Sequence, residues 1–81
     1  MMSIGEIQTE FAVKNGLSVH TLINGRQRWV SKVRDECILA CRRRPPFPTL
    51  QVLAAHFDYA DHTSVLSAVR RAKAREKLAA K

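Results

Sequence analysis

The stretch HFDYADHTSVLSAVRRAKAR, residues 56–75, determines how the chain is organised. Four consecutive polar residues, 61–64, stand directly before an apolar stripe with helical spacing, which consists of Val65, Leu66, Val69 and Ala72. A shorter apolar pattern ends just ahead of them at Phe57. Two helices joined by a short turn are typical of a helix-turn-helix. The sequence therefore predicts this motif over residues 49–77, with Thr49 capping its first helix and Asp58 in the turn.

The rest of the chain is also predicted to be helical. A first helix is expected over residues 4–15. A short helical turn is expected between Ser18 and the Asn24-Gly25 dipeptide. A third helix is expected to be capped by Ser31 and to end near Arg43. The proline cluster after Arg43 cannot continue a helix. Because no segment shows strand alternation, we expect one compact all-α domain over residues 1–81.

Charge is the strongest compositional signal. The chain carries a net charge of +7, and all of its lysines and arginines except Lys14 fall in two blocks, residues 26–44 and 62–81. This imbalance favours a polyanionic partner such as nucleic acid. Residues 25–33 are expected to form a basic loop, and Trp29 within it is expected to cover the edge of the core.

Several other functions are disfavoured. No apolar run is long enough to cross a bilayer and the N-terminus does not resemble a signal peptide, so we expect a cytoplasmic, nucleoid-associated protein without membrane contact. Cys37 and Cys41 are expected to be reduced core thiols rather than a disulfide or metal ligands. A core this small leaves little room for a catalytic pocket. No enzyme activity, cofactor or metal is expected.

The motif DHTSVLSAVRR, together with HF a few residues upstream, resembles the C-terminal DNA-binding domain (domain IV) of the bacterial replication initiator DnaA. GRQRWVSKVRDECILACRR is similar to the basic loop and following helix of that domain. The resemblance covers about residues 4–73. It implies a helix-turn-helix domain with a fold like that of the Trp repressor and a double-stranded DNA partner.

The resemblance also implies roles for individual residues. Asp61, His62 and Thr63 would read bases in the major groove, while Ser64 stands where the family has a phosphate-binding Thr. Arg34 stands where the family has an arginine that opens a helix and enters the minor groove. The basic loop would hold the DNA backbone through Arg26, Arg28 and Lys32. Thr49 and Ser67 complete the expected DNA-binding set.

The chain departs from the family at several positions. Ala60 replaces a basic residue, Asp58 and Tyr59 replace the glycines of the turn, and Ser67 replaces a contacting His. It has no GxxxxGK[ST] loop, so no nucleotide is expected by that route. The resemblance implies a stand-alone, sequence-specific DNA-binding protein that regulates transcription or the use of replication origins.

Other interpretations of the same residues remain open. Asp61 can simply cap the last helix, and Arg42, Arg43 and Arg44 can act structurally at a helix C-terminus. Most of the cations in residues 70–77 are expected on a solvated face. The basic blocks could instead bind an acidic protein, which would make the chain an interaction adaptor. A single predicted helix-turn-helix indicates a monomer or a weak homodimer.

Overall fold

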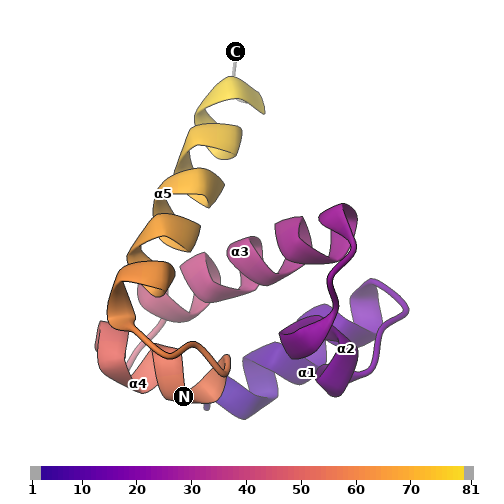
Figure 1. Ribbon diagram of the computed structural model, residues 1–81, viewed down its shortest axis with the longest axis horizontal. Helices are drawn as coiled ribbons and strands as arrows, with labels where there is room; N and C mark the ends of the chain where they lie inside the picture. Colours follow the sequence, from indigo (N-terminus) through magenta and orange to yellow (C-terminus); the bar gives the residue numbers. More distant parts are fainter. Residues whose placement is uncertain (1–2, 80–81) are drawn as a thin grey trace.

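The computed structural model describes residues 3–79, which form five α-helices and no strand. The helices are α1 (Ile4–Lys14), α2 (Val19–Asn24), α3 (Arg28–Arg43), α4 (Leu50–His56) and α5 (His62–Ala79). The prediction of a compact all-α chain is confirmed. Figure 1 shows α3 crossing the middle of the molecule, with α1, α2 and α4 below it and α5 rising at one side. The α3 helix packs against α1, α2 and α5, and α4 packs against α5 and α1.

Local side-chain caps fix where most helices begin. Ser3 and Glu6 form a reciprocal capping box at α1, and the hydroxyls of Ser18 and Thr49 accept hydrogen bonds from the third backbone N–H of α2 and α4. Gly16, with a φ of 68°, follows α1 in the left-handed conformation that glycine adopts without strain. These starts agree with the predictions, because capping depends only on residues close in sequence.

The start of α3 differs from the prediction. Ser31 does not cap this helix; it lies in the first turn, and its backbone N–H donates to the carbonyl of Gln27 at 3.0 Å. The earlier start places Val30, which is buried, on the same side as Val33 and Cys37. The expected basic loop is therefore short, because residues 28–33 are helical and only residues 25–27 connect α2 to α3.

Buried residues of all five helices form the core. Leu53, Phe57 and Val65 are buried there, together with the free thiols Cys37 and Cys41. The hydrogen bond with Cys41, together with burial, raises the pKa of the Cys37 thiol. Phe47 is not part of this core, since it is 60% exposed. It lies between two prolines in the segment that connects α3 to α4, outside the packed helices.

A buried carboxylate joins α3 to α5. Asp35 is 1% exposed and accepts hydrogen bonds from Arg71 Nε at 3.0 Å, Arg71 Nη2 at 3.1 Å and Arg75 Nη2 at 3.1 Å. The bond to Asp35 raises the pKa of Arg71. Arg71 is exposed, as expected for this segment, whereas Arg75 is partly buried, and both arginines hold the two helices together.

Candidate nucleic-acid interface

The residues between α4 and α5 turn the chain sharply. The backbone N–H of Phe57 donates to the carbonyl of Leu53 at 2.9 Å, and that of Tyr59 donates to Ala54 at the same distance. Asp58 adopts a φ of 57°, the left-handed conformation that the sequence allowed for it. The turn thus presents the start of α5 at the surface, where Asp61, His62 and Thr63 are all exposed.

Asp61 caps α5. Its Oδ1 accepts the backbone N–H of Thr63 at 3.0 Å and lies 3.2 Å from His62 Nδ1. The bond from the Thr63 N–H lowers the pKa of this carboxyl group, so the cap stays charged near neutral pH. The capping interpretation of Asp61 is confirmed, and the same side chain remains accessible to solvent.

One face of α5 carries polar residues and no core contact. Thr63, Ser67 and Arg70 follow one another at intervals of four and three residues, so they lie along one side of the helix, and all three are exposed. Ser64 is half-buried beside them. Arg70 was not among the predicted site residues, although its spacing from Thr63 and Ser67 could have indicated it.

The amino end of α3 carries a second group of polar residues. Arg26 lies in the connection before α3, Arg28 is the first residue of the helix and Lys32 lies one turn later. All three side chains are exposed. Since Lys32 follows Arg28 by four residues, both project from the same side of α3. This places three of the predicted DNA-binding cations together.

The expectation that Arg34 opens a helix is wrong. Arg34 does not open a helix but lies in the second turn of α3, half-buried, with its guanidinium directed at α2. Its Nε donates to the carbonyl of Leu22 at 2.8 Å and its Nη2 donates to the carbonyl of Gly25. These carbonyls at the end of α2 lack intrahelical partners, so Arg34 supplies the missing donors.

An Arg34→Met variant is expected to lose about 1.5–3 kcal/mol of unfolding free energy, because the hydrogen bonds it removes have a charged donor. Urea unfolding followed by far-ultraviolet circular dichroism measures this loss. Lys32→Met removes an exposed cation from the same helix and should change stability by less than about 0.5 kcal/mol. Equal stability of the two variants would contradict a structural role for Arg34.

Other arginines are also engaged within the molecule. Arg43 forms two hydrogen bonds with the carboxylate of Glu76 at 2.7 and 2.9 Å, Arg44 pairs with Glu10, and Arg42 donates to the carbonyl of Pro48. The hydrogen bond with Arg43 lowers the pKa of Glu76. The structural interpretation of these three arginines is thus supported. The cations without an ion pair or hydrogen bond within residues 3–79 are Lys14, Arg26, Arg28, Lys32, Arg70, Lys73 and Lys77.

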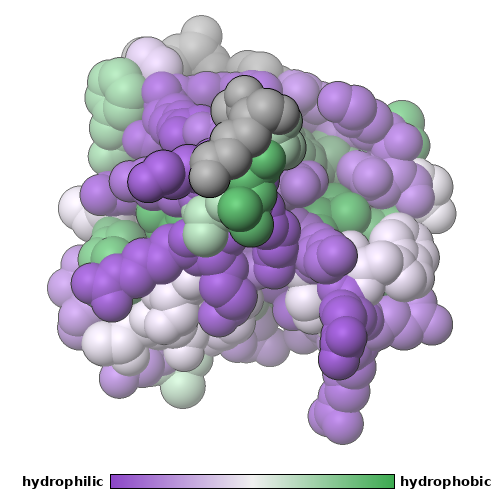
Figure 2. Space-filling model, turned by 90° about the horizontal axis from the view of Figure 1, so that it is seen from above, coloured by the Kyte–Doolittle hydropathy of each residue, from purple (hydrophilic) through white to green (hydrophobic). Residues whose placement is uncertain are grey.

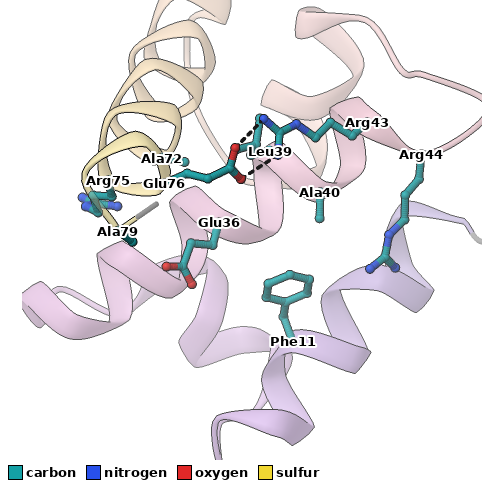
Figure 3. A pocket seen from close by; sticks show the side chains of 10 residues that line it. All are labelled: Phe11, Glu36, Leu39, Ala40, Arg43, Arg44, Ala72, Arg75, Glu76 and Ala79. Carbon is teal, nitrogen blue, oxygen red and sulfur yellow. Dashed lines mark hydrogen bonds and ion pairs between the residues drawn. The ribbon is translucent and has the colours of Figure 1, made fainter. Parts of the chain in front are cut away.

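A cleft of about 560 Å³ lies between α1, α3 and α5. Figure 3 shows Phe11 on one side of it, Glu36 pointing into it, and Arg43 reaching across to Glu76. The lining offers apolar surface and ion pairs, without a nucleophile next to a base. Among residues 3–79 no cluster of three His, Cys, Asp or Glu side chains could hold a metal ion. No helix in this part of the chain could cross a membrane.

The two exposed polar groups lie far apart. In Figure 1 the start of α5 and the start of α3 are near opposite ends of the longest axis, along which the Cα atoms extend over 31 Å. The face seen in Figure 2 is mostly hydrophilic, with small apolar patches between charged side chains. Any ligand that contacts both groups must therefore be long.

Comparisons with models of protein families, with curated proteins and with solved structures gave no match.

Proposed function

We propose that the chain binds double-stranded DNA in a sequence-dependent manner, with the start of α5 in the major groove, and so regulates transcription or the use of replication origins. One observation carries this proposal: Thr63, Ser67 and Arg70 are exposed along one face of a helix that begins directly after a tight turn. Helix-turn-helix proteins insert the start of their second helix into the groove in this way.

The chemistry of the α5 face suits base and phosphate contacts. A threonine methyl packs on the methyl group of thymine, and serine or threonine hydroxyls bind phosphates or bases. Arg70, two turns after Thr63, carries a charge that no carboxylate within residues 3–79 neutralises. The likeness of DHTS to the signature of the DnaA DNA-binding domain gives further support.

The cations at the start of α3 would supply a second contact with backbone phosphates. A molecule 31 Å long can reach phosphates almost one helical turn of DNA apart, since one turn measures about 34 Å. Arg26, Arg28 and Lys32 have no neutralising partner within residues 3–79, so their charge is available to DNA. Arg34 has no part in this proposal, because its guanidinium holds α2.

Selection of bound fragments from a random DNA pool should yield a preferred site, on which Thr63→Ala is expected to lose about 1–3 kcal/mol of binding free energy. The loss should be smaller on unrelated DNA, because a methyl–methyl contact depends on the base. Arg26→Ala should weaken both DNAs about equally and reduce the salt slope of binding by roughly 1. Fluorescence anisotropy at several salt concentrations measures both effects.

Lys14→Ala serves as the control for loss of one exposed cation, since Lys14 is the last residue of α1 and belongs to neither exposed polar group. It should change the binding of either DNA less than Arg26→Ala does. The α5 face is proposed to read bases and the cations at the start of α3 to bind phosphates. These roles are wrong if the pool yields no preferred site, or if Thr63→Ala and Arg26→Ala behave alike. In that case, tight binding to an acidic protein would favour the alternative function, a protein-interaction adaptor.

A further inference from the structure

The one tryptophan of the chain lies among unpaired cations. Trp29 is the second residue of α3, is 50% exposed and does not belong to the hydrophobic core. The expectation that it covers the core edge is therefore wrong. Arg28 precedes it, Lys32 follows it by one turn and Arg26 lies just before the helix. We call these four residues the α3 amino-terminal patch.

The patch is compact on one side of the helix. At 100° per residue, Lys32 projects between Arg28 and Trp29, so both cations lie on the same side of the helix as the indole. Glu36 projects from the same side one further turn along and points into the cleft of Figure 3. It marks the end of the positive surface. Buried Val30, on the opposite side, anchors this part of α3.

We propose that the α3 amino-terminal patch binds single-stranded nucleic acid, with one unpaired base stacked on Trp29 and the adjoining phosphates held by Arg26, Arg28 and Lys32. An exposed indole next to exposed cations offers the two interactions that such proteins combine, namely aromatic stacking and a positive track for the backbone. In a duplex the faces of the bases are already stacked on one another, so an unpaired strand fits the indole better. This inference goes beyond duplex recognition by α5 and does not depend on it.

Trp29 is itself the probe for the test, because it is the only tryptophan in the chain. A thymidine oligonucleotide of about 12 nucleotides, within the site sizes of single-strand binders, should quench its fluorescence on binding. Inorganic polyphosphate, which offers phosphates but no bases, should bind without comparable quenching. Quenching of equal depth by polyphosphate, or saturated oligonucleotide binding without quenching, would overturn the proposal.

Variants locate the contact. Anisotropy of a labelled oligonucleotide should show that Trp29→Ala weakens binding about ten-fold, and Trp29→Phe less, because a smaller ring still stacks. Lys32→Ala should weaken binding more than Lys77→Ala, which removes the same charge from the last turns of α5. Unchanged affinity of Trp29→Ala, with helix content verified by circular dichroism, would refute the site.

Single-strand binding by the α3 amino-terminal patch can be tested separately from duplex binding by α5. Thr63→Ala changes the α5 face and leaves the patch intact, so it should bind the oligonucleotide like the unmodified chain. If quenching succeeds while the duplex selection fails, the patch alone is the nucleic-acid site. If the selection succeeds and the oligonucleotide does not quench Trp29, single-strand binding by the patch is wrong.

Discussion

An Asp35→Asn variant is expected to unfold with a free energy about 3 kcal/mol lower than that of the unmodified chain. The Asp35 carboxylate is buried and accepts three charged hydrogen bonds, which join α3 to α5. Asparagine has a similar shape but no charge, so the partly buried Arg75 would lose its counter-ion. Arg71 is half exposed and can turn to solvent. The expected loss of unfolding free energy is therefore at the lower end of the range for breaking a buried ion pair.

The matched control for Asp35→Asn is Glu76→Gln. Both variants remove one carboxylate that pairs with an arginine between α3 and α5, so both raise the net charge by one. The Arg43–Glu76 pair is about half exposed, and loss of such a pair costs about 0–1 kcal/mol. Urea unfolding of the two variants measures the difference. Equal losses would mean that the burial of Asp35 contributes nothing to its role.

A Phe57→Ala variant is expected to lose about 3–5 kcal/mol of unfolding free energy, a large part of the stability of a small domain. Phe57 is 1% exposed and lies directly after α4, at the start of the turn that presents α5. Removal of its ring leaves a cavity in the core beneath this turn. Thermal and urea unfolding measure the loss. DNA binding should weaken with it, because the start of α5 would no longer be held in place.

Phe47→Ala is the control for Phe57→Ala, since it is the same change ten residues earlier. Phe47 is 60% exposed, so its removal should change stability by less than about 0.5 kcal/mol. Both residues are phenylalanines, and residue type alone does not distinguish their environments. A loss for Phe47→Ala as large as that for Phe57→Ala would place Phe47 against the core in solution.

The candidate site was predictable in part. The exposed start of α5 follows from the spacing of its apolar residues, and the cap at Asp61 from the residue type. The role of Arg34 was not predictable, because its partners Leu22 and Gly25, at the end of α2 and just after it, lie 12 and 9 residues earlier in the chain. The first turn of α3 was missed because burial of Val30, a tertiary effect, extends the helix beyond the potential cap at Ser31.

The helical character of the chain and most helix boundaries follow from local sequence. Caps such as Ser18 and Thr49, the proline cluster and the left-handed residues Gly16 and Asp58 act through neighbours a few positions away. Which cations are structural and which remain available for a ligand depends on how the helices pack. Asp35 and Arg71 are 36 residues apart and Arg43 and Glu76 are 33 apart, so these pairs exist only after α5 has packed on α3. Electrostatic pairing depends on distance in space, which the spacing of charges along a sequence does not give.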